Sequence, residues 1–371
     1  MRVAIIYHIF PHYRRPVLRE LVKHGEHEFS FFSSLETVHG IRAFQGDDLI
    51  TISPIYFKLR GSTWVLRKYI PIVLSARFDA VIVHGHPNMP ASWIIGILGR
   101  LTGKKVLYWA HGWLRKERPL RATVRNLHYS LAHHVMTYGE RAIELARASG
   151  FDASKITPIF NSLDWELAQA KFVKLEAAGT GKTKLNLGFR TDDFVVSCVA
   201  RLTQLCRFDI LIEAGNILGR EGVPIRIALI GDGPERRNLE VLAETRGVEV
   251  DFVGETYDEE LISQYVYASD VTASPGKVGL SAMHSLMYGT PVVSHDNLDD
   301  QMPEVEAIVS GITGTLFTQD SAQALADTLR YWYQRRGDRE RTRVACLDVI
   351  KVRYNPVVQA RTINQVISSL A

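Results

Sequence analysis

The stretch ASPGKVGLSAMHSLMYGTPVVS, at residues 273–294, decides how the fold of this chain is interpreted. Small residues open a short helix there, and Pro291 restarts the chain as a buried strand. The first backbone amides of the helix, at Val278, Gly279 and Leu280, have no partner inside it. Free amides and the positive end of the helix dipole attract a phosphate group. The stretch therefore predicts a phosphate site; an ordinary glycine-bearing turn of an α/β protein is the alternative.

Short apolar runs alternate with amphipathic helical stretches along the whole chain. Such alternation predicts βαβ units and parallel sheets. The expected strands are Val3–Tyr7, Glu28–Phe32, Ala80–His84, Val106–Ala110, Val135–Tyr138 and Ile156–Phe160 in the first half, and Phe194–Ala200, Ile225–Gly231, Val248–Val253, Val271–Ser274 and Val292–His295 in the second.

The length of 371 residues suits two domains with sizeable cores. Gly, Thr and Lys dominate around 177–186, which predicts a linker between them. We therefore expect an α/β fold of two Rossmann-like, doubly wound domains. The expected parts are an N-terminal domain at 1–175, a linker at 176–190, a C-terminal domain at 191–355 and a separate last helix at 356–371 that packs back on the N-terminal domain.

The composition is that of a globular protein of the cytoplasm. Hydrophobic residues make up 46% and charged residues 23% of the chain, which is ordinary for such proteins. The three cysteines lie far apart and have neither disulfide nor metal-ligand spacing, which favours a reducing compartment. No signal peptide or membrane-spanning helix is predicted, because the apolar runs are too short or too interrupted.

Positive charge gathers in the first part of the chain. Residues 1–150 hold 21 Lys and Arg against 10 Asp and Glu, whereas the remainder holds 23 against 30. Within the basic stretch 51–130, Trp64–Ile72 mixes aromatic, aliphatic and basic residues as an interfacial helix does. These features favour contact with an anionic membrane surface or a phosphorylated acceptor; a solvated surface without a partner is the alternative. No nucleic-acid-binding module is found.

Two further turns follow predicted strands in the second half. Gly231–Glu240 opens a helix after a strand but lacks the third glycine of a dinucleotide fingerprint. Arg201 lies just past another strand, and its planar guanidinium suits a diphosphate. Both turns are expected at the carboxyl edge of the sheet, where doubly wound folds bind ligands. A surface arginine is the alternative for Arg201.

These turns belong to five motifs that follow one another over residues 195–315. They are Ala200–Ala214, Ile230–Arg236, Asp251–Gly254, Ala268–Val271 and the Gly279-Leu280 pair followed by Gly289–Val292. In order and spacing they resemble the carboxyl half of retaining glycosyltransferases of the group 1, family 4 class. The amino-terminal half resembles this class more loosely, through Tyr7–Arg14, Asp79–His86, Trp109–Gly112 and Asn161–Asp164.

The resemblance implies the GT-B arrangement, in which two Rossmann-like domains face a central cleft. It places a nucleotide-sugar donor, UDP- or GDP-linked, mostly on the second domain and the acceptor on the first, with no further cofactor. The residues it assigns to the donor are Arg201 and Arg207 at the diphosphate, Lys277, Val278, Gly279 and Leu280 at the distal phosphate, Gly233 in the cleft wall, Glu255 and Thr256 near the base, and His284 as a hydrogen-bond acceptor.

Three residues of the first domain are candidates for the transferred sugar and the acceptor. His111 corresponds to the family histidine that faces the sugar; a cleft-wall residue without a chemical role is the alternative. His12 and Arg14 follow the first strand and are expected to meet a phosphate or hydroxyl of the acceptor, unless they only shape their loop.

One departure from the family is large. The family's paired glutamates, eight residues apart, correspond here to Gly276 and His284, which puts the contacts to ribose and hexose in doubt. Glu304 and Glu306 are within reach of the same cleft in this interpretation.

The resemblance implies retaining transfer of a hexose to a hydroxyl of a glycan or lipid-linked acceptor. We expect no metal, because no Asp-x-Asp motif ends a strand, and cations with helix amides suffice to steady the leaving diphosphate. A non-catalytic relative that binds nucleotide sugars remains an alternative, motivated by the missing glutamates. A nucleotide-sugar epimerase lacks its carboxylates here, and a nicotinamide dehydrogenase lacks its glycine fingerprint. The acceptor, the linkage and the oligomeric state stay open.

Overall fold

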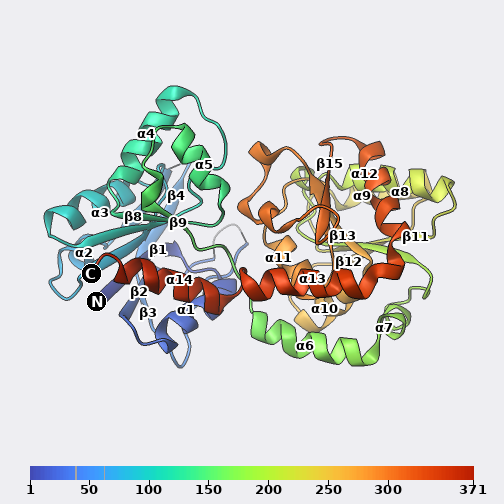
Figure 1. The fold of residues 1–371 in the computed structure, drawn as a ribbon, viewed down its shortest axis with the longest axis horizontal. Coiled ribbons are helices and arrows are strands. Elements are labelled where there is room, and N and C mark those ends of the chain that lie inside the picture. Colours follow the sequence, from blue (N-terminus) through green and yellow to red (C-terminus); the bar gives the residue numbers. More distant parts are fainter. Residues whose placement is uncertain (38–39, 62) are drawn as a thin grey trace. The chain divides into compact units, whose positions relative to one another are not determined.

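The computed structural model describes residues 1–37, 40–61 and 63–371, and Figure 1 shows its ribbon. The chain forms two compact units. Unit 1 comprises Met1–Asp164 together with Tyr354–Ala371, and unit 2 comprises Trp165–Arg353.

Unit 1 contains nine of the described strands and six of the described α-helices. The strands are β1 (Arg2–Ile9), β2 (Glu28–Ser34), β3 (Ile52–Pro54), β4 (Tyr56–Arg60), β5 (Thr63–Arg67), β6 (Ala80–His84), β7 (Lys105–Trp109), β8 (His134–Thr137) and β9 (Ile156–Pro158). The helices are α1 (Arg15–Lys23), α2 (Ile70–Leu74), α3 (Pro90–Leu101), α4 (Pro119–Ser130), α5 (Arg141–Ala148) and α14 (Pro356–Ser368), with 3-10 turns at His12–Arg14 and Ala153–Lys155.

The sheet of unit 1 is parallel throughout, in the order β3-β2-β1-β6-β7-β8-β9. Helices cover both of its faces, so its central strands are apolar on both sides. In β1, Ala4 and Ile6 pack into a core with α3 and α4, whereas Val3 and Ile5 pack into a second core with α1 and α14. Continuous burial of this kind explains why the strand was recognisable from its apolar run.

Unit 2 repeats the plan with six strands. They are β10 (Phe194–Val199), β11 (Ile225–Ile230), β12 (Val250–Gly254), β13 (Val271–Ser274), β14 (Val292–His295) and β15 (Gly314–Phe317). The helices are α6 (Trp165–Ala178), α7 (Thr180–Asn186), α8 (Phe208–Arg220), α9 (Arg236–Arg246), α10 (Glu259–Ala268), α11 (Leu280–Met287), α12 (Ala322–Gln334) and α13 (Arg339–Val352), with 3-10 turns at Gln204–Cys206, Leu298–Asp300, Pro303–Ala307 and Arg336–Asp338.

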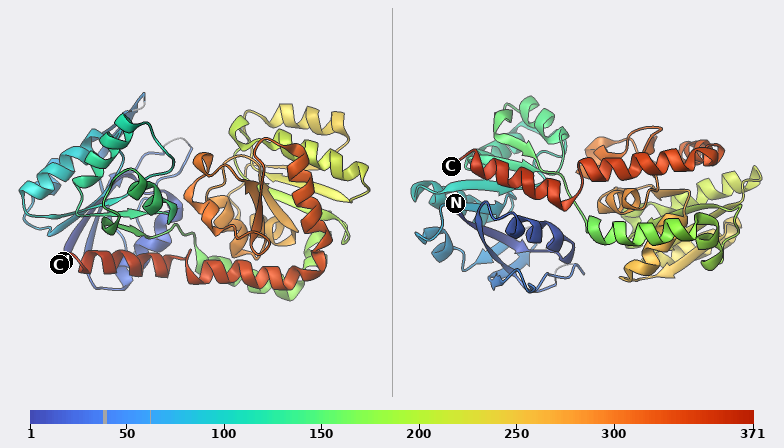
Figure 2. Two further views of the ribbon diagram at one scale, coloured as in Figure 1. Left: turned by 45° about the horizontal axis from the view of Figure 1, so that its top comes forward. Right: turned by 60° about the horizontal axis from the view of Figure 1, so that its bottom comes forward.

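The sheet of unit 2 is also parallel, in the order β12-β11-β10-β13-β14-β15. Figure 2 shows helices on both faces of each sheet. The predicted fold of two Rossmann-like, doubly wound units is therefore confirmed.

The C-terminal helix α14 belongs to unit 1 and packs against α1. Its side chains also bond the rest of the unit: Gln359 Oε1 accepts a hydrogen bond from Ser162 at 2.6 Å. Asn355 caps its start by accepting from the Val358 amide at 3.0 Å, and Pro356 occupies its first position. A break before this helix was expected from the proline, and α13 indeed ends at Val352.

Two segments differ from what composition indicated. Residues 177–186, expected to be a linker, are largely helical as the end of α6 and all of α7, because Lys184 is buried in an ion pair of 2.8 Å with Asp270. Residues 64–72, expected to be an interfacial helix, instead form most of β5 and the start of α2. The Trp64 ring is held within unit 1, stacked on the His86 ring at 4.9 Å.

The strand orders fix where a ligand is expected in each unit. Connections leave in opposite directions from β1 and β6 in unit 1, and from β10 and β13 in unit 2. Loops at the carboxyl ends of such strand pairs diverge and leave a crevice. In unit 2 these loops are 200–207 and 275–279, which contain the predicted phosphate site. None of the described helices has the length and apolar character to span a membrane.

Candidate functional site

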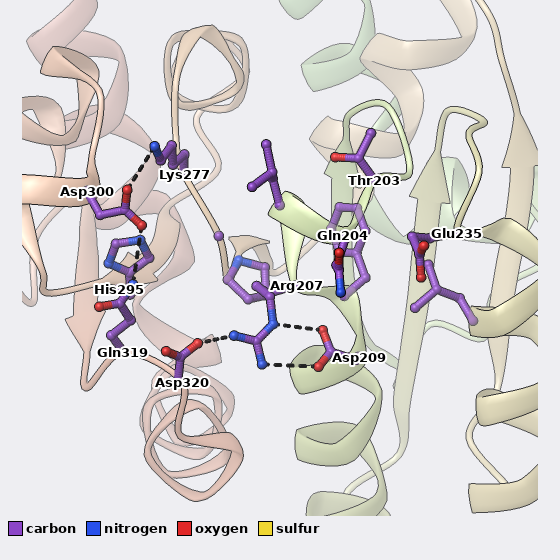
Figure 3. Close-up of a pocket in the computed structure, with 15 residues that line it drawn as sticks. Thr203, Gln204, Arg207, Asp209, Glu235, Lys277, His295, Asp300, Gln319 and Asp320 are labelled. Atoms are coloured by element: carbon purple, nitrogen blue, oxygen red, sulfur yellow. Dashed lines mark hydrogen bonds and ion pairs between the residues drawn. The ribbon is translucent and has the colours of Figure 1, made fainter.

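Loops at the carboxyl ends of the unit 2 strands enclose a pocket of about 610 Å³. Figure 3 shows it in close-up. Its lining is predominantly polar and charged, with four acidic residues beside the cations Arg207 and Lys277. The lining residues are Thr203, Gln204, Leu205, Arg207, Phe208, Asp209, Glu235, Leu239, Pro275, Gly276, Lys277, His295, Asp300, Gln319 and Asp320.

Glycines allow the loops around the pocket to approach backbone to backbone. A Cβ at Gly276 would lie 1.9 Å from the Leu205 carbonyl oxygen, and one at Gly233 would lie 2.2 Å from the Leu202 carbonyl oxygen. The Gly276 amide also donates to the Cys206 carbonyl oxygen at 3.0 Å. The family's first glutamate position is thus closed to any side chain in this backbone arrangement.

Two cations of the pocket carry carboxylate partners (Figure 3). Arg207 pairs with Asp209 at 3.2 Å and with Asp320. Lys277 pairs with Asp300 at 2.8 Å. A phosphate group entering the pocket therefore has to compete with these carboxylates for the two cations. Asp209 is a near neighbour of Arg207 in the first turn of α8, whereas Asp300 and Asp320 come from segments distant in sequence; none of the three was anticipated.

The backbone of Arg207 is itself unusual. It adopts the left-handed region, with φ 53° and ψ 38°, at the N-cap of α8. Side-chain-bearing residues seldom take this conformation, and such strain gathers at binding sites. The conformation places the guanidinium in the pocket that Figure 3 shows.

The start of α11 retains part of the amide array expected from the sequence. The amides of Gly279 and Leu280 make no hydrogen bond to any residue that the structure describes. The Val278 amide, in contrast, donates to Gln301 Oε1 at 2.8 Å, and Val278 is fully buried. In this conformation the Val278 amide is therefore taken, and the expectation that all three amides are open is corrected to two.

Arg201 lies at the same edge of the sheet, just beyond β10. Its side chain is exposed and makes no hydrogen bond or ion pair with the described residues. Its carbonyl oxygen accepts from the Cys206 thiol at 3.1 Å, which ties the backbone of loop 200–207 together. Arg201 is not among the residues that line the pocket, but its cation is uncommitted, unlike those of Arg207 and Lys277.

His284 pairs with a carboxylate that sequence reasoning missed. Its Nε2 lies 2.8 Å from Glu259 Oε1, and the Tyr288 hydroxyl donates to the same oxygen at 2.6 Å. Burial alone would raise the pKa of the Glu259 carboxyl, but the hydrogen bond and charge of His284 hold it below its usual value. With Nε2 committed to a carboxylate, Nδ1 of a neutral His284 is the acceptor nitrogen.

The other residues assigned to the donor bond mainly within their own loops. Glu255 Oε1 accepts from the Tyr257 hydroxyl at 2.9 Å, and Thr256 Oγ1 accepts from the Asp258 amide at 3.1 Å. Gly233 donates its amide to Asp232 Oδ1 at 2.6 Å. Glu304 and Glu306, also considered from the sequence, do not line the pocket; Glu304 is buried and Glu306 half-buried.

His111 is placed in unit 1, two residues beyond the end of β7. Its ring meets the edge of the Tyr138 ring, with centroids 5.0 Å apart. Burial, followed by the charge of Arg14, lowers the pKa of His111 to about 4. The imidazole is therefore neutral at physiological pH and acts as a hydrogen-bonding group rather than a cation.

Arg14 and His12 differ in their exposure to solvent. His12 is exposed, and its amide donates to the Arg42 carbonyl oxygen at 3.0 Å. Arg14 is 7% exposed, and its guanidinium lies over the Trp109 ring at 4.6 Å and bonds the Tyr138 hydroxyl. The expectation that Arg14 meets an acceptor does not fit this conformation, because the side chain that follows the first strand turns into the core.

Two family models match the chain. The model for glycosyl transferases group 1 matches residues 181–345, and the model for the glycosyl transferase 4-like domain matches residues 35–162.

Curated relatives match over shorter stretches. A GDP-mannose-dependent alpha-(1-6)-phosphatidylinositol dimannoside mannosyltransferase of Mycobacterium tuberculosis is 35% identical over 28% of this chain and 27% of its own length. A glycogen synthase of Streptococcus pneumoniae is 25% identical over 67% of this chain and 58% of its own. The chain thus spans less than two thirds of the length of these relatives.

Solved structures match over the full length. Anabaena Alr3699/HepE in complex with UDP is similar with a TM-score of 0.73 and 18% identity, and the apo lipopolysaccharide outer core galactosyltransferase WaaB with a TM-score of 0.70 and 14% identity. Both likenesses cover 100% of each chain and confirm the GT-B fold. With the two family models covering both units, the chain belongs to the group 1, family 4-like glycosyltransferases.

Proposed function

We propose that this protein transfers a hexose from a nucleoside-diphosphate sugar to a hydroxyl of a glycan or lipid-linked acceptor, with retention and without a metal. Glycosyltransferases of this family are retaining hexosyltransferases. The observation that carries the proposal is that the two free amides at the start of α11 follow closely on Gly276 and Lys277 of the unit 2 pocket, to which a neighbouring loop adds Arg207.

The diphosphate is assigned to this pocket by its donors. The Gly279 and Leu280 amides add hydrogen bonds and the positive end of the helix dipole. Arg201 adds an uncommitted guanidinium, and Arg207 and Lys277 become available as phosphate displaces Asp209, Asp320 and Asp300. Phosphate then replaces the carboxylates as the partner of the two cations, and donor binding is expected to weaken at high salt.

The pair of His284 and Glu259 takes the place of a family carboxylate near the sugar and ribose. The Nε2–H of His284 donates to Glu259, so Nδ1 accepts a hydrogen bond from one hydroxyl of the nucleotide sugar. A single acceptor nitrogen makes fewer bonds than a carboxylate, which predicts weak selection among hexoses. Glu255 and Thr256, in the loop after β12, are proposed to approach the base.

Both UDP- and GDP-linked donors stay within the proposal. The similar Anabaena protein was solved with UDP, whereas the mycobacterial relative is named for GDP-mannose. The same relative is named for a phosphatidylinositol dimannoside acceptor. A lipid-linked acceptor would require this enzyme to act at the cytoplasmic face of a membrane.

The chemistry needs no enzymic nucleophile. The bond from the anomeric carbon to the diphosphate oxygen breaks, the acceptor oxygen bonds that carbon on the same face, and the acceptor proton passes to the leaving phosphate. Charge that develops on this phosphate meets Arg201, the helix amides, and Arg207 and Lys277 once these have exchanged their carboxylate partners for phosphate. His111, neutral with a pKa of about 4, is proposed to hold a sugar hydroxyl; His12 remains a candidate for the acceptor.

A second candidate is a relative that binds nucleotide sugars without transferring them. It is favoured by one observation: the backbone around Gly276 admits no side chain where the family has its first glutamate. The two candidates share donor binding and differ only in turnover.

Thermal unfolding with a panel of nucleotide sugars tests the proposal, since a ligand bound only by the folded state raises the unfolding temperature. We expect a shift with a UDP- or GDP-sugar and a roughly 10- to 100-fold weaker affinity in Arg201→Ala, the loss of a charged hydrogen bond. Arg220→Ala, at the exposed end of α8, is the matched control. An unchanged affinity in Arg201→Ala contradicts the diphosphate assignment.

Turnover separates the two candidates. Release of nucleoside diphosphate from the nucleotide sugar that raised the unfolding temperature, with acceptor glycans or with water, supports the transferase. Binding with neither transfer nor slow hydrolysis supports the non-catalytic relative.

A further inference from the structure

Unit 1 carries two exposed apolar stripes on neighbouring helices. On α4, Leu120, Val124 and Leu127 recur at helical spacing on the exposed side, and Leu120 is 77% exposed. On α3, Ile94, Ile97 and Leu101 form a second stripe, and Leu101 is 78% exposed. Both helices turn their other sides to one face of the sheet, so the stripes lie on the outer side of the same layer.

The two helices are joined to one another. Arg100, at the end of α3, donates from Nε to the Leu131 carbonyl oxygen at 2.7 Å and from Nη2 to the Ala132 carbonyl oxygen at 3.1 Å. Ser92 of α3 bonds His128 of α4 at 2.7 Å. The stripes therefore sit on a fixed two-helix layer, which we call the α3–α4 surface.

A cluster of cations precedes α4. Arg115, Lys116, Arg118 and Arg121 line a pocket of about 590 Å³ together with Leu114, Glu117 and Arg125. The one acidic residue in this lining is already committed, because Glu117 forms two hydrogen bonds with Arg125, at 2.6 and 2.7 Å. The four other cations make no ion pair with the part of the chain that the structure describes.

The position of these cations is unfavourable for the helix itself. Arg118 is the N-cap of α4 and Arg121 lies in its first turn, which contains no acidic residue. Cations at a helix N-terminus oppose the helix dipole. Their presence there, beside exposed Leu120, indicates a surface selected for a binding partner rather than for the stability of α4.

We propose that the α3–α4 surface binds the face of a membrane that contains anionic lipid. Its apolar stripes would enter the boundary between headgroups and acyl chains, and the four cations would meet lipid phosphates. A nucleic acid would satisfy the cations but leave the apolar stripes in water. A second copy of the chain would cover the stripes but bring uncompensated cations into an isologous interface.

The surface is separate from the donor pocket, which lies in unit 2. Vesicle binding is measured without a donor, so its outcome does not depend on sugar transfer. Arg201→Ala is expected to bind vesicles as the wild-type protein does, whatever it does to nucleotide-sugar binding.

Co-sedimentation of the full chain with vesicles tests the proposal. We expect binding to vesicles that contain phosphatidylglycerol, little binding to pure phosphatidylcholine, and release at high salt, since surface charges are screened. The double variant Arg118→Gln/Arg121→Gln should bind roughly 20-fold more weakly, given the usual contribution of each cation near an anionic bilayer. Leu120→Ser/Leu127→Ser should also bind more weakly, and high salt should release its remaining binding more completely, because that binding rests on the cations.

Matched variants in unit 2 control for general changes of charge and apolar exposure. They are Lys182→Gln/Arg220→Gln for the cations and Val173→Ser/Val352→Ser for the exposed aliphatic side chains. Thermal unfolding of each variant verifies that it folds.

Equal binding of wild-type protein and both unit 1 variants to anionic vesicles would overturn the proposal. So would binding to phosphatidylcholine alone at the same strength. If the wild-type protein is instead a dimer that the leucine variant dissociates, without an effect on vesicle binding, the surface is an interface between copies and the proposal is wrong.

Discussion

The two units place cations at equivalent strand ends but treat them in opposite ways. In unit 2, Arg207 and Lys277 lie in an open pocket and pair with carboxylates that a ligand phosphate can displace. In unit 1, Arg14 is buried against the rings of Tyr7, Trp109 and Tyr138, and it forms no ion pair with a carboxylate in the described part of the chain. In the proposed function, arginine serves binding where its partners are exchangeable carboxylates, and it packs in the core where its partners are fixed rings.

The histidines differ between the units mainly in how many of them are buried. Unit 1 buries a group of imidazoles in its core and along the strand ends, and burial lowers their pKa values: to about 3 for His8 and His128, and to about 4 for His111. In unit 2, His284 keeps a carboxylate partner. His295, also in unit 2, is buried and burial lowers its pKa as well, so unit 1 differs in holding more imidazoles of this kind.

Acidification should give the largest effect and should act on unit 1 first. A buried histidine with a lowered pKa stays neutral while the unfolded chain takes up a proton below about pH 6.5. Stability is thus complete above that pH and falls as the pH drops towards about 3 for His128. Near pH 5 the loss for His128 alone is about 2 kcal/mol in the free energy of unfolding.

Denaturant unfolding followed across this pH range measures the slope. His128→Gln should flatten it, whereas His24→Gln, at an exposed position after α1, should not. A slope that is the same in all three proteins would contradict the assignment to buried imidazoles.

Gly276→Ala should give the next largest effect, in unit 2. The new Cβ would lie 1.9 Å from the Leu205 carbonyl oxygen, so two loops have to separate. We expect a loss of about 2–3 kcal/mol in the free energy of unfolding and weaker donor binding. Restoring the family residue with Gly276→Glu should be at least as damaging.

Gly219→Ala is the control, since a Cβ there meets no atom within 4 Å and the site is helical. It should be neutral or stabilise the protein by about 0.5–1 kcal/mol. If Gly276→Ala is equally harmless, the loops are not locked together and position 276 is open to a side chain.

Arg14→Ala should destabilise unit 1 by about 2 kcal/mol, because the three ring contacts and the bond to Tyr138 are lost. Arg15→Ala removes only an exposed ion pair with Asp47 and should cost less than about 1 kcal/mol. Thermal and denaturant unfolding compare the two neighbours. Unchanged stability of Arg14→Ala with a raised KM for the acceptor would show that Arg14 is a ligand contact, contrary to this account.

Asp300→Asn should have the smallest effect, and in the opposite direction. The substitution frees Lys277 from its 2.8 Å ion pair and so should tighten binding of nucleoside diphosphate about two- to fivefold. Asp299→Asn is the neighbouring control, and calorimetric titration is the measurement. Weaker binding in Asp300→Asn would mean that Asp300 itself contacts the ligand.

The sequence predicted most central strands well, because central parallel strands are buried on both faces and give apolar runs. Three of them, β6, β13 and β14, were delimited to the residue. The edge strands β3 and β15 were not found, since both are only partly buried and their sequences, ISP and GTLF, give no such run. Helix α7 was taken for a linker because its anchor, the ion pair of Lys184 with Asp270, joins residues distant in sequence.

The loops that form the site were predicted from the sequence, but the acidic side chains that pair with its cations were not. Glycine turns, Arg201 and the start of α11 are local signals. The partners Asp300, Asp320 and Glu259 come from segments distant in sequence, and only tertiary structure brings them to Lys277, Arg207 and His284. The burial of Arg14 was equally invisible, because an arginine after a first strand gives no sign of the rings around it.

Amide hydrogen exchange with and without nucleoside diphosphate tests the central claim most directly. The account predicts that UDP or GDP slows exchange in residues 275–284, at the start of α11, and in loop 200–207, while residues 10–14 of unit 1 are unchanged. Unaltered exchange at 275–284 under saturating ligand, or slowing confined to unit 1, would contradict it.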